Sequence, residues 1–499
     1  MITALMILTA IGILGWGFYR ALPLGKLGLV AWGQSAVLML PWLLLFGLVE
    51  LGVRINLAVI LLVLLLAIGI YILLGRWLRT IAASQPELLT RARTAQNSSS
   101  LGLPNAANPD TNASEQSPPV SSPPSFEVIT PIPAADLQAI QGIFGVDTFF
   151  ATETVPYQDG VICKGNLRGE PATVHRRLSE NLQTVLADQY RLFLVANQED
   201  KPVVVILPSR NDPQPTTTLQ KVLAVVLILA TMATCLETSA ILQGFSFYNQ
   251  PERLPEALPI ALGLLSVLAV HELGHRWLAR RHQVKLSPPF FLPTWQIGSF
   301  GALIRFESLL PNRQALFDIA LAGPATGGLL ALLLLVVGLV LSHPGSGFQV
   351  PALFFQSSIL VGTLARVVLG DALQESLVSV HPLVVLGWLG LVITALNLMP
   401  AGQLDGGRVV QAIYGRKVAG RATIITLILL AIAAVANALA LYWAIVILLL
   451  QRDLERPSLE ELSELDDTRA AVGLLALFLM AATLIPLAPG LAGRLGIGG

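Results

Sequence analysis

The chain has 499 residues, of which 54% are hydrophobic and only 12% are charged. A soluble domain normally has about a quarter charged residues, so this deficit argues against an ordinary soluble protein and indicates a polytopic membrane protein. The formal net charge is zero, which gives no reason to expect nucleic acid as a partner. Cys163 and Cys235 lie in different regions, so they predict neither a disulfide framework nor a cysteine-based zinc site.

Three apolar runs open the chain, and each is close to the roughly 20 residues that a helix needs to cross a bilayer. They cover residues 2–19, 27–49 and 56–74, and residues 1–93 form the first predicted domain. Basic residues cluster after the first and third runs, so the positive-inside rule places that side in the cytoplasm. The first residues resemble neither the basic region of a signal peptide nor a transit peptide, which favours a retained first span.

Residues 94–125 have a different composition, rich in Ser, Pro, Asn and Ala, which predicts a disordered linker. Residues 126–215 then have the composition of a soluble domain. The predicted elements of this domain are a helix that opens at Pro133, a helix from Arg176 to Tyr190, and strands at 160–163 and 203–207. We expect a small α+β domain on the cytoplasmic side, because it follows the third span.

The predicted membrane core occupies residues 216–450, and an acidic loop and a C-terminal span follow in residues 451–499. The apolar segments of this half lie at 219–242, 258–278, 315–341, 384–398, 422–450 and 470–487. A helical portion at 353–368 leaves open whether the chain crosses the membrane there. The predicted fold is an all-α polytopic membrane protein with about nine transmembrane helices and a re-entrant hairpin, together with the small soluble α+β domain.

The predicted hairpin lies in residues 287–311, where the helical pattern stops. Pro288, Pro289 and Pro293 exclude a helix, and the mixture of aromatic, Gly and β-branched residues that follows indicates extended structure. Non-helical backbone at membrane depth is tolerated only where it lines a cavity, so a re-entrant hairpin fits the low charge of this segment. An ordinary surface loop is the alternative.

The fifth predicted span ends in an HExxH motif, His271-Glu272-Leu273-Gly274-His275. Residues four apart lie on one face of a helix, so His271 and His275 can present two imidazoles to one metal ion. Zinc fits best, because it is tetrahedral and keeps an open position for water, from which Glu272 can take a proton. Ionisable residues inside an uncharged span are costly, which favours a metal site over satisfied core residues.

Two histidines leave a third ligand position to fill. His282 leaves the membrane with the basic cluster, and Asp318 lies near the start of a span, where it could be structural. Asp405 is the better candidate, because Pro400 breaks the preceding helix and nearby glycines allow an irregular backbone. This segment and the HExxH helix both run towards the cytoplasm, so their depths match. The alternative role for Asp405 is a cap of the next helix.

The HExxH motif within a span, followed downstream by Asn-x-x-Pro-x-x-x-Leu-Asp-Gly from Asn397, resembles the site-2 protease family of intramembrane zinc metalloproteases, peptidase M50. The resemblance covers the chain from about residue 219 to residue 450. It implies zinc bound by His271, His275 and Asp405, with Glu272 as the catalytic residue. It also implies a substrate that is a single-span transmembrane protein, cleaved within or near the bilayer in regulated intramembrane proteolysis.

A closer resemblance is carried by Gly165-Asn166-Leu167-Arg168-Gly169 and by residues 144–150 of the soluble domain. These segments are similar to the plastid and cyanobacterial branch named for ethylene-dependent gravitropism-deficient and yellow-green mutants. With the extra N-terminal spans, the similarity implies a cyanobacterial member in the plasma or thylakoid membrane, with an active site near the cytoplasmic side. From its residues alone, the Gly165–Gly169 segment predicts a polar turn, either structural or binding.

Asn397 is a further candidate, because its amide could hydrogen-bond the substrate backbone or an oxyanion, or pack between helices. The functional hypothesis is an intramembrane zinc metalloendopeptidase that acts on membrane-anchored proteins in a lipid bilayer. A polytopic transporter also has broken helices and intramembrane charges, but it has no need of Glu272 between two histidines. An inactive protease-like scaffold is another alternative, and the intact Glu272 argues against it.

Overall fold

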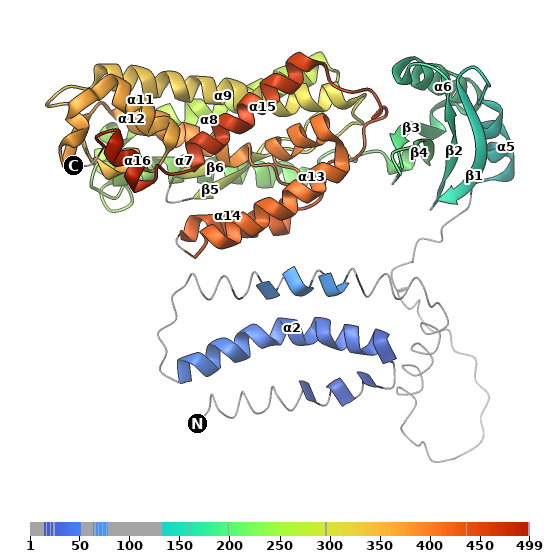
Figure 1. Cartoon of the computed structure of the whole chain (residues 1–499), viewed down its shortest axis with the longest axis horizontal. Helices are drawn as coiled ribbons and strands as arrows, with labels where there is room; N and C mark the ends of the chain where they lie inside the picture. Colours follow the sequence, from blue (N-terminus) through green and yellow to red (C-terminus); the bar gives the residue numbers. More distant parts are fainter. Residues whose placement is uncertain are drawn as a thin grey trace, which may run out of the picture. The chain divides into compact units, whose positions relative to one another are not determined.

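The computed structural model of the chain describes residues 132–497, except 158, 198, 295, 296 and 436, and before them helix α2 (Gly25–Glu50) with scattered residues of 14–22 and 63–77. The chain divides into two compact units, of which the first is Met1–Phe126 with Leu427–Leu449 and the second is Glu127–Thr426 with Leu450–Gly499 (Figure 1). Helix α2 covers the second predicted span. The predicted first and third spans lie largely outside the described residues, and the predicted linker lies outside them entirely.

The soluble part of the second unit is a four-stranded antiparallel sheet with two helices. Its elements are α5 (Ala134–Gly142), β1 (Phe149–Tyr157), β2 (Gly160–Leu167), α6 (Pro171–Leu186), β3 (Tyr190–Ala196) and β4 (Pro202–Pro208). The strand order is β1-β2-β4-β3. Val174, Leu178 and Leu182 follow one another at intervals of four along α6, so they form one apolar face that packs on the buried side of the sheet.

The predicted helix over residues 176–190 is wrong in its bounds. Helix α6 starts at Pro171, because proline is favoured in the first turn, where its missing N–H has no partner to lose. It ends at Leu186, since Ala187 has a φ of 49°, which an α-helix does not allow. A 3-10 turn, Ala187–Gln189, then leads into β3.

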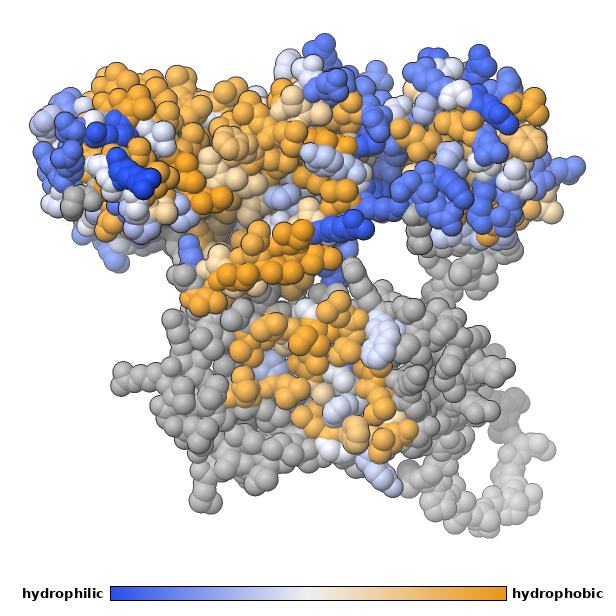
Figure 2. Space-filling model, viewed as in Figure 1, coloured by the Kyte–Doolittle hydropathy of each residue, from blue (hydrophilic) through white to orange (hydrophobic). Residues whose placement is uncertain are grey.

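Four helices among the described residues are long and apolar enough to cross a membrane. They are α7 (Thr218–Leu242), α8 (Leu254–Arg281, extended at its start by a 3-10 turn from Pro251), α9 (Arg313–Leu341) and α15 (Asp467–Leu484). Large apolar side chains on their outer faces are exposed, among them Leu229 and Leu333. Figure 2 shows this part as mainly hydrophobic and the small α+β part as mainly hydrophilic. A membrane protein explains the exposed apolar surface, whereas nine spans are not confirmed.

Helix α12 (Pro382–Asn397) is shorter and is buried on nearly all sides. It packs against α9, which in turn packs against α8, and Figure 1 shows the three helices running alongside one another. A helix that is apolar all round needs cover from its neighbours, and α8 and α9 supply part of that cover. These helices form the frame around the HExxH segment.

The single span predicted over residues 422–450 is wrong. The chain forms α13 (Asp405–Ala433) and then a separate helix, α14 (Ala438–Val446). The break has a local cause, because the side chain of Asn437 accepts a hydrogen bond from Leu439 N and so caps the start of α14. Apolar residues continue on both sides of the break, so the sequence pattern did not reveal it.

The proline-rich segment forms the expected extended structure, a hairpin of β5 (Phe290–Thr294) and β6 (Gly298–Leu303) that contacts α7. Its depth in a membrane stays a prediction. The segment around residues 353–368 forms two short helices, α10 (Leu353–Gln356) and α11 (Ile359–Leu369), and neither is long enough to cross a bilayer. The remaining elements are β7 (Phe348–Pro351), which pairs with β8 (Leu377–Val380), and α16 (Pro489–Arg494).

A short extended segment, Leu459 to Glu461, joins the soluble part to the helical part of the second unit. On one side Leu194 N in β3 donates to Leu459 O at 2.8 Å, and Glu461 N donates to Leu194 O at 3.0 Å. On the other side Leu459 N donates to Leu310 O at 2.8 Å, and Glu460 N donates to Pro311 O at 3.1 Å. We call this segment the strap. It extends the sheet edge to the residues that precede α9.

Candidate active site

Helix α8 presents His271, Glu272 and His275 to the interior, with exposed fractions of 7%, 6% and 1%. The neighbouring helix α9 comes very close to them. A Cβ added at Gly323 would lie 2.1 Å from His275 Nε2, so only glycine fits at this position of α9. The two imidazoles are thereby enclosed, and their ring nitrogens face one another at 3.2 Å.

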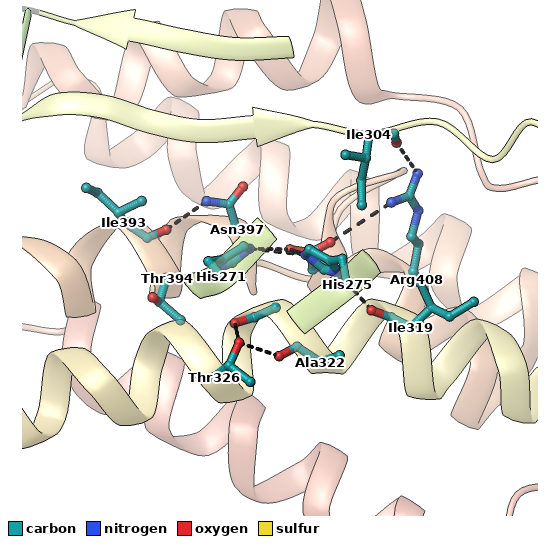
Figure 3. Close-up of polar contacts among 12 residues, drawn as sticks. His271, His275, Ile304, Ile319, Ala322, Thr326, Ile393, Thr394, Asn397 and Arg408 are labelled. Carbon is teal, nitrogen blue, oxygen red and sulfur yellow. Dashed lines mark hydrogen bonds and ion pairs between the residues drawn. The ribbon is translucent and has the colours of Figure 1, made fainter. Parts of the chain in front are cut away.

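The orientation of the His275 ring is set by α9. His275 Nδ1 lies 2.7 Å from Ile319 O, and a carbonyl oxygen can only accept, so Nδ1 carries the hydrogen (Figure 3). In the neutral ring Nε2 then has a free lone pair, which is the form that binds a metal. The backbone of α9 therefore selects the tautomer and aims Nε2 at His271.

Asp405 reaches the same point from the first residue of α13. Its Oδ2 lies 3.3 Å from Nε2 of His271 and 3.3 Å from Nε2 of His275. The turn before α13 makes this approach possible, since Gly402 has a φ of 48° and lies directly against the backbone of Gln451. Three side chains from two helices thus place one donor atom each within 4.8 Å of the others.

These distances fit a tetrahedral zinc ion. Donor atoms about 2.0–2.1 Å from a tetrahedral metal are about 3.3–3.4 Å from one another, and the three contacts here measure 3.2, 3.3 and 3.3 Å. Two imidazole nitrogens and one carboxylate oxygen are a common donor set for catalytic zinc. Glu272 Oε2 is one of the few described side-chain atoms that are buried without a hydrogen-bond partner, as expected for a group that awaits water or substrate.

Comparison with known proteins identifies the chain's relatives. Two protein-family descriptions match, "EGY3 middle domain" over residues 138–215 and "Peptidase family M50" over residues 259–436. The chain is 36% identical over 402 residues to the probable zinc metalloprotease EGY1, chloroplastic, of Arabidopsis thaliana, covering 73% of each. The chain belongs to peptidase family M50, in its EGY branch.

Other members of the EGY branch match at similar levels. The probable zinc metalloprotease EGY2, chloroplastic, of Arabidopsis thaliana is 40% identical over 363 residues, which are 71% of this chain and 65% of that relative. The probable zinc metallopeptidase EGY3, chloroplastic, of the same plant is 32% identical over 378 residues, 71% of this chain and 66% of that relative. The chain thus spans about two thirds of the length of these relatives. No solved structure matches it.

The two rejected ligand candidates lie together, in contact with each other. His282 Nε2 is 3.0 Å from Asp318 Oδ2, and Arg469 Nε donates to Asp318 Oδ1 at 2.7 Å. This contact links the end of α8, the first turns of α9 and the start of α15. All acceptor atoms of Asp318 have partners here, so its role in this M50 chain is structural, as the sequence suggested.

Asn397 joins α12 to the hairpin. Its Nδ2 donates to Phe300 O in β6 at 2.9 Å and to Ile393 O at 2.9 Å. Figure 3 shows the contact between Asn397 and Ile393. Both amide hydrogens are therefore engaged, and the geometry favours the packing role over donation to an oxyanion. The amide oxygen is left as the atom that could meet a substrate N–H.

The Gly165–Gly169 segment has a structural position in the soluble part. Gly165 lies so close to β1 that a Cβ there would be 2.2 Å from Phe150 O. The N–H of Arg168 donates to Thr148 O at 2.8 Å, and the Arg168 side chain is exposed. The motif thus closes the end of the β1–β2 pair.

Sequence reasoning did not single out Arg408, although it is only 2% exposed and lies three residues after Asp405. Its guanidinium pairs with Glu455 Oε2, at 3.0 Å from Nε and 2.9 Å from Nη2. The spacing from Asp405 is the one signal that could have pointed to it, because residues three apart on a helix are neighbours. Its partner is 47 residues away, and no local pattern predicts that pairing.

Proposed function

We propose that this chain is a zinc metalloendopeptidase that hydrolyses peptide bonds of membrane-anchored proteins within or near the bilayer. One observation carries the proposal. His271 and His275 lie on a helix that is long and apolar enough to cross a membrane, and both meet Asp405 at distances that suit zinc ligands. Membership of peptidase family M50 supports it, as do relatives that are named zinc metalloproteases.

In this proposal His271, His275 and Asp405 would hold a zinc ion, since their Nε2, Nε2 and Oδ2 atoms face one another. When bound, zinc polarises a carbonyl oxygen and makes a water molecule more acidic. The protein's part is to fix the three donor atoms. The hydrogen bond from His275 Nδ1 to Ile319 O holds one ring, and the close contact with Gly323 leaves it no room to turn away.

Glu272 acts as the general base and then as the general acid. Its buried Oε2 has no partner in the described part of the protein, so it is available to accept a proton from water. The same carboxylic acid then donates the proton to the amine that leaves when the peptide bond breaks. Glu272 occupies the position next to His271 on α8, which keeps the carboxylate beside the ligand atoms.

The substrate that we propose is a single-span transmembrane protein. Exposed apolar side chains on α7 and α9 support a site that is reached through lipid. The active site would lie near the cytoplasmic side, because the HExxH segment is followed by Arg276, Arg280 and Arg281. A bacterial, cyanobacterial origin with a plasma or thylakoid membrane location is part of the same proposal, whereas the named relatives are chloroplastic plant proteins.

The hairpin completes the proposed site as a docking edge or cover for the substrate. Support comes from its attachment to α12 through Asn397 and from its contact with α7. A peptide bond must be extended to be attacked, and a β-strand edge can hold an extended segment by backbone hydrogen bonds. The oxygen of Asn397 would then face that segment.

The test is Glu272→Gln in the full chain, reconstituted in membranes with a labelled single-span protein as substrate. We expect the wild-type chain to carry one zinc ion and to cleave. The variant should keep its zinc but cleave about 10²–10⁴-fold more slowly, because the proton carrier is lost. Zinc content and cleavage products are measured on the same samples.

Glu256→Gln is the matched control, since Glu256 lies on the same helix but is exposed and paired with Arg253. Its cleavage rate should equal that of the wild type. Removal of zinc by a chelator should abolish cleavage, and added zinc should restore it. A wild-type chain without zinc, or a Glu272→Gln variant that cleaves at the wild-type rate, would refute the proposed function.

A further inference from the structure

Arg408 is a buried cation between three segments of the chain. Its Nη2 donates to Ile304 O, one residue past β6, at 2.9 Å, and the same side chain pairs with Glu455. Its Cζ lies 4.8 Å from the centre of the Phe306 ring. One guanidinium therefore fastens the first turn of α13, the end of the hairpin and the segment that leads to the strap.

Arg408 also lies close to Asp405, so it can act on that carboxylate as well as join the three segments. Asp405 Oδ2 faces both histidines, whereas Oδ1 faces Arg408 Nη1 at 4.0 Å. The cation thus attracts the oxygen that does not face the ligand cluster. This favours the carboxylate rotamer in which only Oδ2 is offered to a metal.

Glu455 is itself held in place by α13. Gln411 Nε2 donates to Glu455 O at 3.2 Å, and Glu455 N donates to Gln411 Oε1 at 3.1 Å. Glu455 is 7% exposed, so the pair with Arg408 is shielded from water. A buried ion pair stabilises a fold little compared with apolar residues of similar size, so stability alone does not account for it.

We infer that Arg408 and Glu455 form a positioning pair for the metal ligand Asp405. The pair sets the direction of the carboxylate and fixes the start of α13 against the hairpin. The inference rests on the proposed zinc site and adds two residues to it. Arg408 acts through Asp405 and does not itself bind the metal, because its guanidinium carries only donors and a positive charge.

The test measures metal affinity in the full chain by competition with a chromogenic chelator. Arg408→Met should weaken zinc binding about 10–100-fold, the usual effect of removing a partner that orients a metal ligand. The zinc affinity of Arg408→Lys should lie between those of Arg408→Met and the wild type. Lysine keeps the positive charge but lacks the planar guanidinium that contacts several partners at once.

Cobalt(II) in place of zinc gives a readout that a merely structural role would not change. The visible spectrum of the cobalt-loaded chain reports the ligand geometry. We expect the bands of Arg408→Met to lose intensity or shift, because Oδ1 of Asp405 is then free to approach the metal. Arg408→Lys should restore part of the wild-type spectrum.

Arg313→Met is the matched control. Arg313 lies at the start of α9, away from the ligand atoms. It donates to Ala412 O and Ile413 O of α13, the helix that carries Arg408, at 2.7 Å each. This variant should lose thermal stability but keep its zinc affinity within about threefold. An equal loss of affinity in Arg313→Met and Arg408→Met would overturn the inference.

A double variant guards against simple misfolding. Arg408→Met alone leaves Glu455 buried without its cation, which can unfold the chain, whereas Arg408→Met with Glu455→Met removes both charges. The double variant should fold and still show the weaker zinc binding. A double variant with wild-type affinity and cobalt spectrum would refute the positioning role. A wild-type chain that binds no zinc would instead refute the proposed function.

Discussion

At the scale of single residues, two of the proposed zinc ligands face a group that can orient them. Ile319 O selects the nitrogen of His275 that carries the hydrogen, and Arg408 faces the outer oxygen of Asp405. These constraints are made before any ligand arrives. Pre-oriented donors lose little conformational freedom when they bind a metal, so such a site can bind tightly without a large ligand set.

His175 in the soluble part gives a prediction about pH. Burial lowers the pKa of its imidazole from the usual 6.5, and the contact with Leu192 O and the charge of Glu460 oppose this shift less strongly. The unfolded chain then binds more protons than the folded chain between the two pKa values. The soluble part should therefore keep its full stability above pH 6.5 and lose stability as the pH falls below it.

Cys163 supplies the measurement. It is fully buried in the same part, and burial raises the pKa of its thiol to about 11, so a thiol reagent should label it only after local unfolding. The site of labelling is identified by mass spectrometry. The urea concentration at which half of Cys163 is labelled should decrease when the pH is lowered from 7.5 to 5. His175→Gln keeps a donor for Leu192 O but cannot be protonated, and its midpoint should be nearly constant. If the urea midpoint of His175→Gln depends on pH as strongly as that of the wild type, the prediction is contradicted.

At the scale of elements, the hairpin depends on α12 for its position. Asn397→Leu removes the hydrogen bond to Phe300 O, a loss of about 0.5–1.5 kcal/mol. We expect faster hydrogen exchange in β6 and a lower cleavage rate. Thr394→Val is the control, because the Thr394 hydroxyl donates to Gly390 O of its own helix, one turn before Asn397. Equal exchange in the two variants would show that Asn397 does not hold the hairpin.

Elements differ in how far the sequence predicts them. The HExxH helix and Asp405 were predictable, because helical spacing and a proline–glycine break are local signals. The break at Asn437 was not, since apolar residues continue on both sides of it. The pair of Arg408 and Glu455 depends on a contact across 47 residues, and a single sequence contains no signal for such a contact.

At the scale of the whole second unit, the strap is a shared edge between the soluble and helical parts. Glu461→Pro removes the N–H that donates to Leu194 O, a loss of about 0.5–1.5 kcal/mol. Spin labels placed in β4 and at the start of α9 should then show a broader distance distribution. Glu461→Ala keeps the N–H and should retain the wild-type distribution. A narrow distribution in both variants would mean that the strap does not hold the two parts together.

The pairing of Arg408 with Glu455 also has a consequence for the order in which the protein is made. The ribosome synthesises the HExxH helix and Asp405 well before Glu455, which follows Arg408 by 47 residues. On the inference above, Asp405 gains its final orientation only when that late segment has emerged and paired with β3 and α13. A nascent chain would therefore enter the membrane as an incomplete protease. If membrane proteins are the substrates, as proposed, they would be protected from cleavage until translation of this segment is finished.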